Sequence, residues 1–275
     1  MNEKIFLEII ADISKIFNET KFASPNLIEL KEENERDAVT SLDLYIHKKV
    51  EGLICEHKFI DLYSEESKNL KNIDLPLDKK IMLLDPLDGS LNYAVGLDFY
   101  CSLIAYINNG ILEFSGICIP SIKQIVAYNF LENSLISSKP IVPSNKEISG
   151  PTYLAYGSSS EPLESDIQFK MTNIINQFGN GIFRLGSAGY GAYLAIIGKL
   201  SGFVGINIKC WDILPILSIA KYMGHEVFYR LKGDSVDIVF SSKSNFLKPI
   251  LEEFEKYGSP LNSHELNKPL DSTNA

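Results

Sequence analysis

The stretch LLDPLDGSLNY, residues 83–93, ends an apolar run with two carboxylates that stand three residues apart. Like charges at this spacing cost free energy unless a cation lies between them. We interpret the run as a buried strand whose carboxyl end carries Asp85, because α/β proteins commonly place their sites there. Pro86 stiffens the turn, and Gly89 permits a backbone conformation that residues with a side chain avoid.

Two interpretations fit this stretch equally well when it is taken alone. In the first, the two carboxylates and the Leu87 carbonyl bind a hard cation, chiefly Mg²⁺, and the N–H groups after Gly89 face a phosphate. In the second, an Asp-Pro turn simply leads into a capped helix. Other parts of the chain must decide between them.

Further acids follow predicted strands or begin predicted helices. Glu65 and Glu66 end the strand before this one, Asp212 opens an apolar helix, and Asp43 begins another. Each acid alone is typical of a helix cap or a solvated charge. Together they favour a shared cation site.

Composition narrows the class of protein. The 275 residues are 45% hydrophobic and 22% charged, as in an ordinary soluble domain, with 26 basic against 35 acidic residues and a net charge of −9. This balance argues against binding a nucleic-acid polymer. The four cysteines show no CxxC spacing and lie in apolar runs, so we expect buried thiols rather than zinc or disulfides. No signal peptide or membrane-spanning run is visible, so we expect a cytoplasmic protein without membrane contact.

The hydrophobic pattern predicts a layered α/β (α+β) sandwich in which helix and sheet layers alternate. An amphipathic helix over residues 2–18 is followed by several strand candidates, two of which are joined by the hairpin turn Asn108-Asn109-Gly110. We predict an N-terminal metal-binding α+β half over residues 1–140 and a C-terminal α/β half over 141–275, together one compact unit. The polar tail after Gly258 is expected to be loose.

The sequence from Asp85 to Ser90, followed by Asn92-Tyr93, resembles the first signature of the inositol monophosphatase family. These are lithium-sensitive, Mg²⁺-dependent phosphatases that include 3′(2′),5′-bisphosphate nucleotidases and fructose-1,6-bisphosphatase-like members. Trp211-Asp212, with Gly224 closing the helix, resembles the second signature. The resemblance covers about residues 30 to 230, because further matches lie in the family's order. These further matches are Asp37, Val39-Thr40, Asp43, Glu65-Glu66 and Arg184 to Gly189.

The resemblance implies a sugar-phosphatase-like sandwich and a phosphomonoesterase that uses metal-activated water on a small phosphorylated metabolite. The implied ligands of two or three Mg²⁺ ions are Glu66, Asp85, the Leu87 carbonyl, Asp88 and Asp212. The implied catalytic residues are Glu66 together with Asp43 and Ser90, which orient and help deprotonate the water. The implied substrate-binding residues are Asp88, Gly89, Ser90, Arg184, Ser187, Ala188 and Asp212. Family members are commonly dimers, so a homodimer is compatible with the resemblance.

Several features leave alternatives open. Ser90 stands where the family more often has threonine, and the 31–37 loop does not align well enough to receive a role. Gly205 lies seven residues before Asp212, where inositol-specific members carry a glutamate, which weakens an inositol-specific interpretation and leaves room for a nucleotide or sugar bisphosphate. One alternative is a non-catalytic subunit that binds a phosphorylated metabolite. Another is an aspartyl-phosphate phosphatase with Asp85 as nucleophile, although its DxD spacing is missing.

Overall fold

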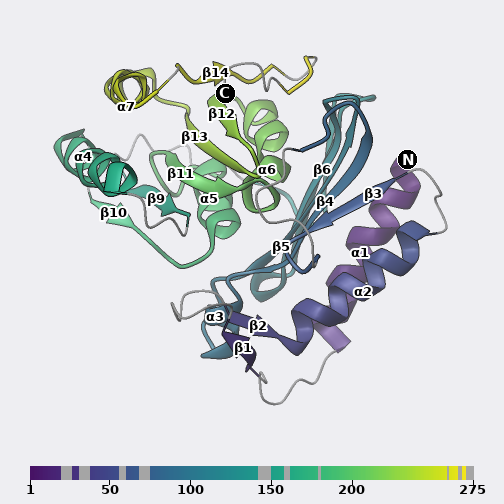
Figure 1. The fold of residues 1–275 in the computed structure, drawn as a ribbon. Helices are drawn as coiled ribbons and strands as arrows, with labels where there is room; N and C mark the ends of the chain where they lie inside the picture. Colours follow the sequence, from purple (N-terminus) through teal and green to yellow (C-terminus); the bar gives the residue numbers. More distant parts are fainter. Residues whose placement is uncertain are drawn as a thin grey trace.

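Five alternating layers of helices and sheets make up the computed structural model (Figure 1). Two helices cover one sheet, two more lie between the sheets, and a last pair covers the second sheet. These pairs are α1 (Glu3–Glu19) with α2 (Ser41–Cys55), α5 (Ala188–Ile196) with α6 (Cys210–Tyr222), and α4 (Pro162–Phe178) with α7 (Ser244–Lys256). The structure describes residues 1–19, 27–30, 38–55, 60–67, 75–141, 150–157, 162–178, 181–258, 260–265 and 268–270. The predicted layered α/β fold is confirmed.

The first sheet has the order β3-β4-β5-β6-β7-β8. Its strands are β3 (Asp61–Ser64), β4 (Lys80–Asp88), β5 (Cys101–Asn108), β6 (Ile111–Ile119), β7 (Gln124–Asn129) and β8 (Ser134–Ser137). β3 runs parallel to β4, and the later neighbours are antiparallel. Asn109 and Gly110, both with positive φ, form the predicted turn between β5 and β6.

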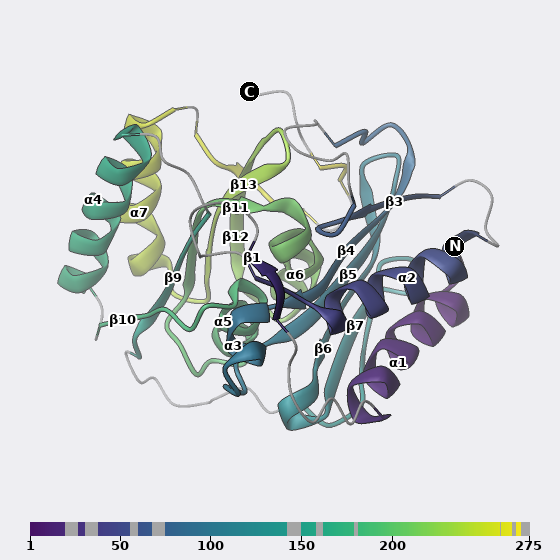
Figure 2. The same ribbon diagram turned by 60° about the horizontal axis from the view of Figure 1, so that its bottom comes forward.

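The second sheet has the order β10-β9-β11-β13-β12-β14. Its strands are β9 (Thr152–Tyr156), β10 (Ile182–Phe183), β11 (Phe203–Lys209), β12 (Glu226–Lys232), β13 (Ser235–Ser241) and β14 (Asn262–Ser263). β10, β9 and β11 are parallel, and the remaining pairs are antiparallel. A separate antiparallel pair, β1 (Leu27–Leu30) and β2 (Ala38–Thr40), lies near α3 (Ser90–Ala94) (Figure 2).

The apolar pattern of each helix matches its layer. On α1, Phe6, Ile9, Ile10 and Ile13 recur at helical spacing and pack on the first sheet. α5 and α6 are apolar around most of their circumference because sheets lie on both sides of them. This middle layer carries the contacts between the two halves. The division at residue 140 stays a prediction.

Three expectations need correction or lie outside the description. The tail after Gly258 is not loose throughout, because Leu261 and Leu270 are buried and the Leu270 amide donates to the Gly110 carbonyl. Cys55 is exposed, whereas the other three cysteines are buried as expected. The 31–37 loop lies outside the described residues. Within those residues, none of the helices has the length and apolar character that crossing a bilayer requires.

Candidate active site

The end of β4 carries Asp85 inside the protein. Its register against β5 shifts between Asp85 and Asp88, so the Pro86-Leu87 step leaves the regular ladder. The Leu87 amide donates to Asp85 Oδ1 at 2.9 Å, and Ser102 Oγ donates to the Asp85 carbonyl at 3.1 Å. The Asp85 side chain is 1% exposed. The loop therefore turns one carboxylate inward and holds it there.

Asp88 is bound by groups from β5 and from the start of α5. Ser187 Oγ donates to its Oδ2 at 2.7 Å, the Gly189 amide to the same oxygen at 2.6 Å, and the Ala188 amide to Oδ1 at 3.1 Å. The Cys101 thiol donates to Oδ2 at 3.5 Å. This network joins the two halves of the chain at one carboxylate.

A second hydrogen-bonded unit joins α2 to α3. The Thr40 amide and hydroxyl donate to Asp43 Oδ2 at 2.7 and 2.6 Å, and Ser90 Oγ lies 2.8 Å from Asp43 Oδ1. Ser90 Oγ also lies 2.7 Å from the Leu87 carbonyl oxygen. Because a hydroxyl carries one proton, Ser90 donates to one of these acceptors at a time. The predicted pair of Asp43 and Ser90 is therefore in direct contact.

Gly89 connects these two units and needs its lack of a side chain. Its φ is +96°, and a Cβ there would lie 2.8 Å from the Phe99 carbonyl oxygen and 3.1 Å from Ser187 Cβ. Any other residue would be strained and would push the segments apart. Glycine thus lets the strand end, α3 and α5 approach closely.

Electrostatic repulsion among the acids shifts the pKa of Asp85. Burial raises the pKa of Asp85 well above its usual range, and the negative charges of Glu65, Asp212, Asp88 and Asp43 raise it further, in that order. Asp212 lies in the first turn of α6 and is half-buried. Carboxylates from four segments therefore gather around Asp85.

The other two buried acids show the same effect. Burial raises the pKa of Asp88, although its bonds from Ser187, Gly189 and Ala188 oppose the shift. Burial also raises the pKa of Asp43, against the bonds from Thr40 and Ser90, with a small contribution from the charge of Glu66. The sequence predicted a ligand role for Glu66 and none for Glu65. In the structure Glu65 is the acid whose charge acts most on Asp85.

The donor set fits hard divalent cations. It consists of carboxylates and a backbone carbonyl, which are oxygen ligands. Because neighbouring negative charges raise the pKa of Asp85, a cation bound here would reduce the repulsion among the carboxylates. Among the described residues, no three His, Cys, Asp or Glu side chains already stand as close together as ligands of one ion.

The segment before α5 forms the side of the site that the resemblance assigns to substrate. Tyr153 Oη donates to the Ser187 carbonyl at 2.6 Å and accepts from the Leu185 amide at 3.0 Å. Asn92 Nδ2 donates to the Leu185 carbonyl at 2.5 Å. Arg184, at the start of this segment, lies over the Tyr156 ring. The segment is thus fixed to both sheets and to α3.

Gly205 has a structural reason that the sequence did not reveal. It is buried in the middle of β11, and a Cβ there would lie 2.8 Å from Ile238 Cγ2 and 3.0 Å from atoms of Ile208 and Phe203. Packing therefore requires glycine at this position.

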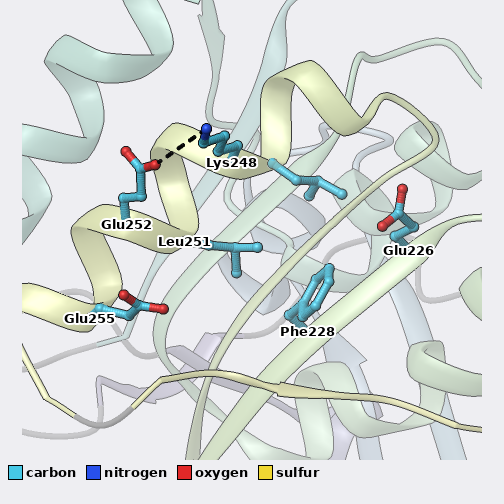
Figure 3. A pocket seen from close by; sticks show the side chains of 7 residues that line it. Glu226, Phe228, Lys248, Leu251, Glu252 and Glu255 are labelled. Atoms are coloured by element: carbon cyan, nitrogen blue, oxygen red, sulfur yellow. Dashed lines mark ion pairs between the residues drawn. The ribbon is translucent and has the colours of Figure 1, made fainter.

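A groove of about 320 Å³ lies elsewhere, between α7 and β12 on the outer side of the second sheet (Figure 3). Its floor is apolar, and Lys248 pairs with Glu252 across 4.0 Å on its rim. The acids at the end of β4 do not line it. This groove is therefore separate from the candidate active site.

Comparison with known proteins identifies the family of the chain. The model of the inositol monophosphatase family matches residues 5–255. The chain belongs to the inositol monophosphatase family.

Individual relatives of this family member are distant. Nus factor SuhB of Xylella fastidiosa is 25% identical over 143 residues, which are 52% of each chain. Inositol monophosphatase 1 of Bos taurus is 23% identical over 241 residues, which are 80% of this chain and 82% of the bovine one. The chain thus spans about half the length of the SuhB protein it matches. An IMPase of Thermotoga maritima superposes with a TM-score of 0.70 at 18% identity, covering 94% of this chain and 100% of that one. An IMPase/NADP phosphatase complexed with Mg²⁺ and phosphate gives 0.69 at 16% identity, covering 96% and 98%. These structures share the fold.

Proposed function

We propose that the chain is a Mg²⁺-dependent phosphomonoesterase that hydrolyses a small phosphorylated metabolite by attack of water. The observation that carries this proposal is the group of carboxylates around Asp85, which come from four separate segments and raise its pKa. Family membership supports it, as does a structural neighbour complexed with Mg²⁺ and phosphate. Phosphoryl transfer needs positioning and charge neutralisation more than a covalent nucleophile.

The groups proposed to hold the metal are Asp85, the Leu87 carbonyl, Asp88, Asp212 and an acid of the Glu65-Glu66 pair. We favour Glu65 as the nearer ligand, because its charge acts on Asp85 while that of Glu66 acts on Asp43. When bound, two or three Mg²⁺ ions neutralise the phosphate dianion and acidify water.

The remaining proposed roles belong to side chains and amides that the structure holds in place. Asp43 and Ser90 orient the attacking water and accept its proton, because Asp43 Oδ1 and Ser90 Oγ are already 2.8 Å apart. The Gly89 and Ser90 amides hold phosphate oxygens. Ser187 and Ala188 bind the alcohol side of the substrate, next to Asp88.

A non-catalytic role is the second candidate, because two relatives carry the name Nus factor SuhB. A protein with that role alone has no need to keep the buried acids, since unbalanced carboxylates cost stability. The structure buries Asp43, Asp85 and Asp88 and half-buries Asp212. Turnover decides between the two candidates.

The test is phosphate release from a panel that includes inositol 1-phosphate, NADP⁺, adenosine 3′,5′-bisphosphate and fructose 1,6-bisphosphate, with Mg²⁺ or EDTA. We expect Mg²⁺-dependent release that Ser90→Ala lowers about a hundredfold and Ser90→Thr retains. Glu65→Gln should reduce Mg²⁺ affinity more than Glu66→Gln. Absence of turnover on every substrate would favour the non-catalytic candidate. Three further predictions remain. Lithium titration tests inhibition, sedimentation tests the homodimer, and cell fractionation tests the cytoplasmic location.

A further inference from the structure

The Tyr153 ring is part of a stack of three aromatic rings in the second sheet. Its centre lies 5.5 Å from that of Phe203 with an interplanar angle of 5°, and the Phe203 ring lies 5.3 Å from that of Phe240 at 11°. The three rings come from the neighbouring strands β9, β11 and β13. The backbone of α5 also lies against the Tyr153 ring, because a Cβ on Gly191 would overlap it. The stack and the helix therefore fix the direction in which the hydroxyl points.

The Tyr153 hydroxyl both donates and accepts, and it does so on the segment before α5. Its Oη donates to the Ser187 carbonyl at 2.6 Å and accepts from the Leu185 amide at 3.0 Å. Tyr153 is 2% exposed, and burial raises its pKa, so the hydroxyl keeps its proton and stays a donor. One oxygen therefore fixes the backbone on both sides of Gly186.

The same segment binds the Asp88 carboxylate. Ser187 accepts from Tyr153 through its carbonyl and donates to Asp88 Oδ2 through its Oγ, at 2.7 Å. The next two amides, of Ala188 and Gly189, donate to Asp88 Oδ1 and Oδ2. A shift of the Ser187 carbonyl would therefore move the groups that orient Asp88.

We propose that Tyr153 is a positioning residue of the site: its hydroxyl sets the place of segment 187–189, and thereby the orientation in which Asp88 meets a metal ion. This inference rests on the proposed function, because it assigns a residue to the proposed metal site. Tyr153 lies on β9 in the second sheet, whereas Asp88 ends β4 in the first. The packing of one sheet therefore controls a carboxylate of the other. Buried partners of metal ligands typically contribute about tenfold or more to metal affinity or activity.

The variant Tyr153→Phe removes the oxygen and keeps the ring, so the stack on Phe203 is retained. Measurements are made on folded protein, well below its Tm. We expect the calorimetric Kd for Mg²⁺, without substrate, to rise about tenfold and kcat/KM to fall by about the same factor. Amide hydrogen exchange over residues 185–189 should become faster, because the Leu185 amide loses its acceptor and the amides bound to Asp88 are held less firmly.

The matched control is Tyr128→Phe. Tyr128 is buried in the same apolar core as Tyr153, and its hydroxyl donates to Asn133 Oδ1 at 3.1 Å, in the turn between β7 and β8. This variant also loses one hydrogen-bonded tyrosine oxygen. It should leave the Mg²⁺ Kd, kcat/KM and the exchange of residues 185–189 as they are in the wild type.

The outcomes separate this inference from the proposed function. If no substrate of the panel is hydrolysed, but Tyr153→Phe weakens Mg²⁺ binding and speeds exchange over residues 185–189, the inference holds and the proposed catalysis fails. Unchanged exchange there, or faster exchange with unchanged Mg²⁺ affinity and kcat/KM, overturns the inference and leaves phosphatase activity to stand on the substrate panel. Equal effects of Tyr128→Phe would also overturn it, because a general loss of stability would then explain them.

Discussion

Ser187 Oγ donates a hydrogen bond to Asp88 Oδ2 across 2.7 Å, joining residues 99 positions apart in the chain. Ser187 Oγ also accepts a hydrogen bond from the Tyr190 amide at 3.2 Å, so the serine caps α5. One hydroxyl therefore fixes both the first turn of a middle-layer helix and a carboxylate at the end of β4. The catalytic geometry that we propose depends on how the two halves pack.

Replacing Ser187 should affect stability and activity together. Ser187→Ala removes the cap and one donor to Asp88, so we expect a loss of about 1–2 kcal/mol of unfolding free energy and a fall of about tenfold or more in kcat/KM. Denaturant titration and phosphate release measure the two effects. Ser187→Thr keeps the hydroxyl and should retain most of both. A fully active Ser187→Ala variant would contradict the link.

A methyl group at position 189 should disturb the same contact by volume alone. A Cβ on Gly189 would lie 2.6 Å from Leu103 Cδ1, 2.9 Å from Cys101 Sγ and 3.0 Å from Asp88 Oδ2. We expect Gly189→Ala to cost about 1–3 kcal/mol by overpacking and to lower activity, because Asp88 must move.

The matched control is Gly52→Ala on the exposed side of α2. Nothing lies within 4 Å of a Cβ at Gly52. Alanine is the better helix former, so this variant should gain about 0.5–1 kcal/mol and keep full activity. If Gly189→Ala and Gly52→Ala shift the Tm in the same direction, close packing around Gly189 does not explain the effect of Gly189→Ala on stability.

The acids at the end of β4 should make the metal-free protein less stable as pH rises. The pKa of Asp85 is raised in the folded state, so its contribution to stability is fully present below the unfolded value of about 4 and is lost as pH rises through the folded value. Asp85→Asn removes that charge. We expect it to raise the Tm in EDTA at pH 8 by a few degrees, and to diminish the further rise that Mg²⁺ produces in the wild type.

Asp78→Asn is the control for this prediction, because Asp78 is an exposed acid in the turn before β4. It should leave both the Tm in EDTA and the Mg²⁺ effect as they are in the wild type. A lower Tm for Asp85→Asn in EDTA would show that the carboxylate stabilises the fold without metal, contrary to the repulsion argued here.

Local patterns predicted the parts of the site that lie close together in sequence. The strand end at Asp85, the need for glycine at position 89 and the helix beginning near Asp43 each follow from a few neighbouring residues. The donors to Asp88 did not, because Ser187, Gly189 and Cys101 reach it only when α5 packs against β4 and β5. Nothing local separates Glu65 from Glu66 either.

The fold shows the same division between local and tertiary signals. α1 was predicted from its periodicity to within a residue at each end, because its apolar face is regular. β14 was missed as a strand, since two residues are too few to show a period and its pairing depends on β12. Spacing alone also does not reveal that Ile238 lies against Gly205.

The buried tail should respond to acid through His264. This side chain is 3% exposed, lies 3.4 Å from Ser218 Oγ and meets the Tyr229 ring edge-on. Burial, with a smaller effect of the Lys221 charge, lowers its pKa to about 4. In the unfolded chain His264 has its ordinary pKa of about 6.5, so below this pH it binds a proton more readily unfolded than folded. Its contribution to stability is therefore present above pH 6.5 and is lost as pH falls toward 4.

The variant His264→Gln isolates this contribution. It should cost stability at pH 7 because the ring packing is lost, and the cost should shrink by about 2 kcal/mol at pH 4.5, where the wild type has lost its advantage. Denaturant titrations of both proteins at the two pH values measure the difference, and the comparison cancels the carboxylates that titrate in the same range. A cost that is equal at both pH values would mean that His264 is protonated in the folded protein, which its buried position between α6 and β12 argues against.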